Sequence, residues 1–352
     1  MSRALDPGTA SSLDTTDNLI PVYHDIAAAL RNTSSDLLEI ELLGTSHPLP
    51  PGRNVLIAGK SIGTTKVKLV QAFMVARRIF FRYVRNCPED KEVDLLDATA
   101  VMLLLDPEQL TAANERKRLI KKREIVPKLE FEALLKKEIQ FVDSYLTSRL
   151  HRHTKSPTLW GHRRWLLEMG KKIGVQYDIQ PDLTSVVLVA AERHSRNYYA
   201  WSHLRWLIQT FSDTPTCVRD FSTPTIDSDY PGTMSAVKNW CLKNPSDTSG
   251  FSFLLFCLFG VADEDSNTSV RSEMCSSVCT DVLRLAVSFR WTHESVWLFL
   301  RTAVASKYAT EELREAFTRA MEDISTAQTQ GQPILEAARD WCARNQQIIG
   351  NA

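Results

Sequence analysis

Apolar residues recur at helical spacing along most of this chain. Between about residues 64 and 86, apolar positions at intervals of three and four alternate with lysines and arginines, which predicts a long amphipathic helix with a basic face. This helix is expected to end at Asn86-Cys87-Pro88, because proline disfavours helical backbone at the residue before it.

Similar patterns predict further helices, separated by short breaks that contain proline or asparagine. One such break is Lys155-Ser156-Pro157, where Ser156 suits an N-cap and Pro157 suits the first helical position. Residues 244–250 are expected to form a turn. The predicted helices cover residues 91–105, 111 onward, 131–150, 183–193, 234–243, 251–256, 281–289 and 293 onward.

One motif occurs twice in the middle of the chain. It reads Trp160-Gly-His-Arg-Arg-Trp165 and Trp201-Ser-His-Leu-Arg-Trp206, and the second copy starts 41 residues after the first. Degenerate copies begin at Phe251 and Trp297, and Ala113 takes the equivalent place in an earlier copy. The intervals between these five positions are 47, 41, 50 and 46 residues, a spacing typical of stacked supersecondary units.

The repeat decides the predicted fold. We expect an all-α protein, a right-handed α-α superhelix in which about five helical hairpins form a crescent-shaped solenoid. A single such domain is expected over residues 19–352, with a mobile insertion near 212–233. Residues 1–18 are rich in small polar residues, and we expect them to be disordered.

The motif has a structural interpretation that needs no chemistry. Trp160, Arg163, Arg164 and Leu167 fall at i, i+3, i+4 and i+7, so an arginine can stack on the indole or pair with a carboxylate of the next hairpin. The histidines are expected to be partly buried hydrogen-bonding residues. The residues interpreted as structural are Trp160, His162, Arg163, Arg164, Trp165, Trp201, His203, Arg205, Trp206, Trp297 and Arg301.

Charge and cysteine content narrow the class of partner and the compartment. Lysine plus arginine equals aspartate plus glutamate at 42 each, so any nucleic-acid or membrane-surface partner would need a local patch. The longest apolar stretch, residues 251–262, is too short to span a bilayer. Seven scattered cysteines without a framework or metal-ligand spacing favour a reducing, cytoplasmic compartment and no metal site in this chain.

The motif residues also carry a resemblance to a known family. The pattern Ser/Asn-x-x-x-Trp-x-His-x-Arg-Trp, which begins at Ser156 and again at Asn197, resembles the repeat of protein prenyltransferase α subunits. Residues 22–58 and 246–251 look more like the divergent, α-subunit-repeat-containing members of that family than like the farnesyltransferase α subunit.

The resemblance implies the α-type subunit of a heterodimeric protein prenyltransferase, which attaches farnesyl or geranylgeranyl groups to protein cysteines. In that family a separate β subunit holds the catalytic zinc, the isoprenoid diphosphate and the acceptor cysteine. This chain would then contain no cofactor and would be inactive alone. Its partners would be the β subunit and, through the complex, the isoprenoid diphosphate and a cysteine-containing protein.

One segment could reach the diphosphate under this reading. The family's Lys-Asn-Tyr run, which lends side chains to the diphosphate region, corresponds here to Arg196-Asn197-Tyr198. Arg196 keeps the positive charge in a planar fork that suits phosphate oxygens. The alternative is that Arg196 is an exposed arginine at the start of a helix.

A second hypothesis comes from a different functional class. The basic cluster of the motif is absent after Phe251 and the last copy is weak. These departures favour a non-enzymatic helical-repeat scaffold that shares the fold.

Overall fold

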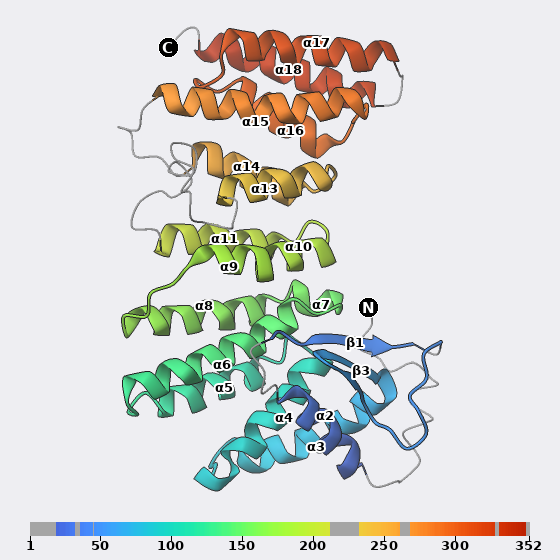
Figure 1. Ribbon diagram of the computed structural model, residues 1–352, viewed down its shortest axis with the longest axis vertical. Coiled ribbons are helices and arrows are strands. Elements are labelled where there is room, and N and C mark those ends of the chain that lie inside the picture. Colours follow the sequence, from blue (N-terminus) through green and yellow to red (C-terminus); the bar gives the residue numbers. More distant parts are fainter. Residues whose placement is uncertain are drawn as a thin grey trace. The chain divides into compact units, whose positions relative to one another are not determined.

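Helices dominate the described part of the chain (Figure 1). The computed structural model describes residues 19–31, 36–44, 46–211, 232–260, 268–327 and 331–349. The predicted all-α class therefore holds for most of these residues. Residues 1–18, and residues 212–231 of the predicted insertion, lie outside the described residues.

The internal contacts divide the chain into two compact units. One unit comprises Met1–Tyr177 and Val189–Ala200, and the other comprises Asp178–Leu188 and Trp201–Ala352. Each unit is described by itself below, and the single domain expected over residues 19–352 stays a prediction.

The first unit combines helices with a small sheet that the sequence analysis did not anticipate. Strand β1 (Glu39–Leu43) runs parallel to β3 (Ser61–Thr65), which pairs antiparallel with β2 (Leu56–Ala58). Ile40 and Ile62 are register partners and both are buried. The helices of this unit pack against the sheet and against each other. They are α2 (Ile20–Leu30), α3 (Lys66–Tyr83), the 3-10 turn η1 (Glu89–Lys91), α4 (Glu92–Leu105), α5 (Leu110–Lys122), α6 (Lys128–Leu146), α7 (His151–Thr154) and α8 (Pro157–Lys172).

Local chemistry sets where these helices begin. The Thr65 side chain accepts a hydrogen bond from the backbone N–H of Lys68 and caps α3. Ser156 caps α8 in the same way through the N–H of Leu159, with Pro157 at the first helical position, so the predicted cap is confirmed. The predicted helix 131–150 is too long at its end, because α6 ends at Leu146.

The second unit contains helices that alternate in their packing. Helix α14 packs on α16 and α16 on α18, while α13 packs on α15 and α15 on α17 (Figure 1). Each helix from α13 to α16 therefore contacts the helix two places further along the chain. The bounds of the remaining helices are α9 (Ile179–Asp182), the π-helical turn η2 (Leu183–Val187), α10 (Leu188–Arg193), α11 (Tyr198–Phe211), α13 (Thr233–Lys243), α14 (Thr248–Phe259), α15 (Thr268–Ser288), α16 (Glu294–Val304), α17 (Glu311–Ala327) and α18 (Gln332–Ile349).

Candidate functional site

Three of the repeated helices share one way of starting. In the copies at Trp160, Trp201 and Phe251, the side chain four residues before the aromatic caps the helix, and its oxygen accepts a hydrogen bond from the backbone N–H three residues on. The copies at Ala113 and Trp297 have no such side-chain cap. Ser156 does this for Leu159 at 3.1 Å, Asn197 for Ala200 at 3.3 Å, and Asp247 for Gly250 at 2.9 Å. The spacing recognised in the sequence is therefore a spacing of helix N-caps.

The carbonyl two residues before the cap is a recurrent acceptor. The Trp160 indole N–H donates to the Thr154 carbonyl at 2.9 Å, and the Trp297 indole N–H donates to the Trp291 carbonyl at 2.8 Å. The Asn197 amide, at the start of the following motif, also donates to the Thr154 carbonyl, at 2.8 Å. Through the Thr154 carbonyl, the start of α8 is thus linked to the start of α11 within the first unit.

Trp297 offers a test of this bond. Its side chain is fully buried, so we expect Trp297→Phe to lower the free energy of unfolding by about 1–3 kcal/mol, because the substitution removes volume and leaves the Trp291 carbonyl unpaired. Urea unfolding measures the loss. Trp165→Phe is the matched control, since Trp165 is partly exposed, and an equal loss in both variants would contradict the assignment.

The motif arginines are divided between buried pairs and aromatic faces. Arg163 is fully buried and its Nε lies 2.6 Å from Asp143 Oδ1 on α6. Arg205 lies over Phe256 and Arg301 over Trp341, with 4.4 and 5.1 Å between guanidinium carbon and ring centroid. Arg163 therefore pairs with the preceding helix α6, not with the following hairpin as predicted, whereas Arg164 beside it is only partly buried.

The histidines of the motif lie inside the protein. His203 is buried, with its ring centroid 5.3 Å from that of Trp206. His162 has no exposed surface, and its Nε2 lies 3.4 Å from Glu138 Oε1. Burial lowers the pKa of His162 to about 4, although the Glu138 carboxylate acts in the opposite direction. This imidazole is therefore neutral near pH 7.

The three residues expected to reach a diphosphate differ in their exposure to solvent. Arg196 is exposed and adopts a left-handed backbone with φ of 57°. Asn197 is buried, and its amide donates to the Thr154 and Ala190 carbonyls. Tyr198 is 67% exposed and lies edge-on to Tyr199. Asn197 is thus engaged within the fold, and only Arg196 and Tyr198 face outward.

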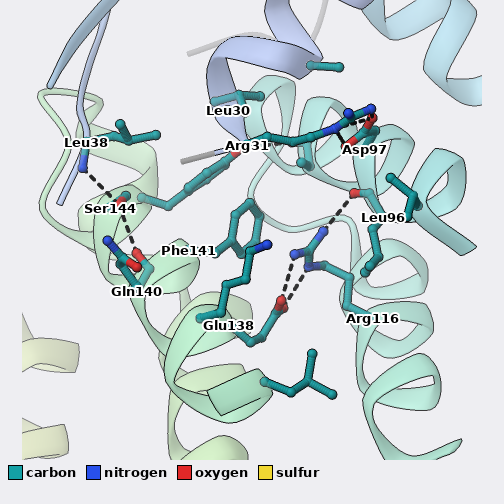
Figure 2. Close-up of a pocket in the computed structure, with 16 residues that line it drawn as sticks. Leu30, Arg31, Leu38, Leu96, Asp97, Arg116, Glu138, Gln140, Phe141 and Ser144 are labelled. Carbon is teal, nitrogen blue, oxygen red and sulfur yellow. Dashed lines mark hydrogen bonds and ion pairs between the residues drawn. The ribbon is translucent and has the colours of Figure 1, made fainter. Parts of the chain in front are cut away.

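A cavity in the first unit brings together residues that the sequence analysis did not single out. It lies among α2, α4, α5 and α6, has a volume of about 190 Å³ and is lined mainly by apolar side chains, including Leu30, Leu38, Leu96 and Phe141 (Figure 2). No motif in the sequence could have indicated this cavity, because its lining residues are scattered along the chain between positions 27 and 145.

Two ion pairs lie at this cavity. Arg31 Nε lies 2.7 Å from Asp97 Oδ1, and Arg116 reaches both carboxylate oxygens of Glu138 at 2.7 Å (Figure 2). The Arg31 side chain is half exposed, whereas those of Arg116 and Glu138 are buried. Burial raises the pKa of Glu138, but the charge and hydrogen bonds of Arg116 outweigh it and keep this pKa below its ordinary value.

Arg116 is held rigidly in the cavity wall. Besides Glu138, its guanidinium donates to the Leu96 carbonyl at 2.8 Å, and its carbon lies 3.8 Å from the ring centroid of Phe141 (Figure 2). It also donates to Thr99 Oγ1 at 3.0 Å. Within each ion pair the arginine and the carboxylate neutralise each other. Lys137, which is exposed, adds one positive charge to the lining. The cavity can therefore receive an apolar group, with a cation available for an acidic neighbour.

Two further structural findings concern the described residues only. None of the helices described here is long and apolar enough to cross a membrane. Within the same residues, no three side chains of the His, Cys, Asp and Glu types come together in a way that could hold a metal ion.

Part of the chain matches a known protein family. Residues 159–282 match the family described as the ECM9 middle domain, which is about a third of the chain and includes both full copies of the motif. No curated protein matches the chain.

This match corrects the family prediction. The region that carried the resemblance matches a different family model, so the assignment to the prenyltransferase α subunits is wrong, and so are the transferase activity and the prenylation role drawn from it. The physical reason lies in the motif itself. Its capping residue, tryptophan and arginine make contacts that hold helices together. A helical-repeat protein can keep such contacts whether or not it is part of an enzyme. The expected β-subunit partner and the cytoplasmic location stay predictions.

Proposed function

We propose that this chain is a non-enzymatic helical-repeat scaffold, in which the helical hairpins stack as a right-handed α-α superhelix and bind a partner protein. Three features support the stacking: the recurrent N-caps, the hydrogen bonds from one helix start to the preceding one, and the packing of each helix from α13 to α16 on the helix two places further on. Nearest-neighbour contacts of this kind are typical of repeat proteins.

The main support for the proposal is that the polar groups of the motif form hydrogen bonds within the fold. The Trp160 indole, the Asn197 amide and the Arg163 guanidinium all bond to atoms of neighbouring helices. A catalytic group must instead face a substrate. Polar side chains arranged in this way serve to fix helix against helix, which is what a binding scaffold needs.

The cavity supplies a place for the partner in this proposal. Its volume of about 190 Å³ is somewhat larger than an apolar cavity of roughly 150 Å³ that accommodates benzene. One aromatic or leucine side chain would fill it. Anchoring of this kind, by a single apolar side chain in a preformed pocket, is a common source of affinity in protein interfaces.

Solution scattering tests the superhelix. A compact protein of 352 residues has a radius of gyration of roughly 20 Å, whereas we expect an extended array to exceed roughly 24 Å. A value at the compact limit would contradict the solenoid.

Filling the cavity tests the partner site. We expect Ala100→Leu to change the free energy of unfolding by less than about 1.5 kcal/mol, because Ala100 lines a void that can take the added volume. The partner proteins that co-purify stoichiometrically with the wild-type chain should be lost with this variant. Leu129→Ala is the matched control, since Leu129 is 78% exposed and does not line the cavity; equal recovery with wild type and Ala100→Leu would exclude the cavity as the anchor.

A further inference from the structure

Basic residues are concentrated in one segment of this electrically balanced chain. Residues 42–88 contain no aspartate or glutamate and eight lysines and arginines, although the whole chain has 42 of each sign. The rest of the chain therefore carries a net charge of −8. This is the local patch that a neutral protein would need in order to bind an anionic surface.

The structure gathers part of this charge on one face of α3. The C-terminal half of α3 and the residues just after it present six side chains within a sector of about 140° around the helix axis, at roughly 100° per residue. All six are exposed. They form what is here called the arginine face: Met74, Arg77, Arg78, Phe81, Arg82 and Arg85.

The arginine face points away from the packed side of α3. Buried residues such as Val75, Ala76 and Phe80 turn the opposite side of the helix toward α2 and α4. Among the residues that the structure describes, no carboxylate pairs with any of the four arginines. Arg77 instead lies over the ring of Phe81, 5.2 Å from its centroid.

Helix stabilisation accounts for only part of this arrangement. Cations near a helix C-terminus interact favourably with the helix dipole, which explains Arg82 and Arg85. The effect falls off within the last turn, so it does not explain Arg77 or Arg78. Nor does it explain why Phe81, at 60% exposure, stands between the arginines.

We propose that the arginine face binds the surface of an anionic phospholipid bilayer. Arginine pairs bidentately with phosphate oxygens, and exposed apolar side chains among the cations can enter the headgroup boundary. The apolar component favours a membrane over a nucleic acid. The same acid-free segment exposes five large apolar side chains, namely Leu42, Leu56, Ile57, Met74 and Phe81.

This inference is independent of the scaffold proposal. It depends on the arginine face, none of whose residues lines the cavity. A chain could bind vesicles without a partner in the cavity, or hold a partner without binding vesicles.

Vesicle flotation of the full chain tests the proposal. We expect binding to phosphatidylcholine vesicles that contain about a third phosphatidylserine, weak binding to pure phosphatidylcholine, and release in about 0.5 M salt. Each basic residue near such a surface contributes roughly fivefold to partitioning. Arg78→Gln combined with Arg82→Gln should therefore weaken partitioning roughly 25-fold.

Two further variants separate a membrane from other partners. Lys171→Gln with Lys172→Gln, which removes two exposed charges from the end of α8, should bind vesicles as the wild type does. Phe81→Ser should also weaken partitioning, by roughly tenfold, and should leave the thermal unfolding midpoint unchanged. Equal binding by wild type and the double arginine variant would overturn the proposal, as would duplex DNA binding that exceeds vesicle binding and is insensitive to Phe81→Ser.

Discussion

Lowering the pH from 7 to 4 is expected to reduce the free energy of unfolding by about 3 kcal/mol for each of His153 and His162. Burial lowers the pKa of both to about 4 from an ordinary value of 6.5, and each unit of difference corresponds to about 1.4 kcal/mol. Between pH 6.5 and 4 the unfolded chain binds protons that the folded chain does not, so stability falls as the pH falls. Above pH 6.5 neither residue contributes to the pH dependence.

The surroundings of the two histidines explain why the neutral form is retained. For His153, burial lowers the pKa and outweighs the hydrogen bond between Nε2 and the Leu103 carbonyl, 3.0 Å away, which raises it. His162 is surrounded by Glu138, Arg116 and Lys117, and the two cations reinforce the effect of burial. Glu138 adds to the loss at lower pH, since its pKa is held below the ordinary value and its stabilising charge is lost on protonation.

Urea unfolding at a series of pH values measures this effect. His162→Gln should remove about half of the loss between pH 7 and 4, and the double variant with His153→Gln should remove most of it. Leu166→Ala, at a buried position without a titratable group, should lower stability by a similar amount at every pH. Parallel pH profiles for His162→Gln and the wild type would contradict the assignment.

The parts of the fold that could be predicted from the sequence are those fixed by local chemistry. The existence of α3 and α4 follows from periodicity, although α3 ends at Tyr83, a few residues before the predicted break at Pro88. The start of α8 follows from Ser156 and Pro157. The turn predicted at residues 244–250 is too long, because Asp247 caps a helix that already begins at Thr248. Here the capping aspartate starts the helix inside the segment that was predicted as the turn.

Contacts distant in sequence could not be predicted in this way. Strand β1 lies beside β3, which follows a loop and a third strand, so its partner is set by tertiary packing. The cavity likewise depends on Arg31 meeting Asp97 and Arg116 meeting Glu138 across 66 and 22 residues. The motif could be found because each of its elements repeats locally, whereas the cavity is formed once and has no sequence pattern.

Replacing Arg163 with leucine is expected to lower the free energy of unfolding by about 3–5 kcal/mol. The substitution leaves the Asp143 carboxylate buried without its cation, and an uncompensated buried charge costs that much. Tyr177 also loses a partner, because its hydroxyl accepts a hydrogen bond from Arg163 at 3.3 Å. Thermal and urea unfolding of the variant measure the loss.

Two comparisons distinguish the buried pair from a general effect of removing an arginine. Arg164→Leu, next to it and only partly buried, should cost less than about 1 kcal/mol. The double variant Arg163→Leu with Asp143→Leu removes both charges together and should recover most of the stability, because apolar side chains can replace a buried ion pair at little cost. If the double variant were as unstable as Arg163→Leu alone, the loss would come from packing around the guanidinium, and the pair would not be the joint between α6 and α8.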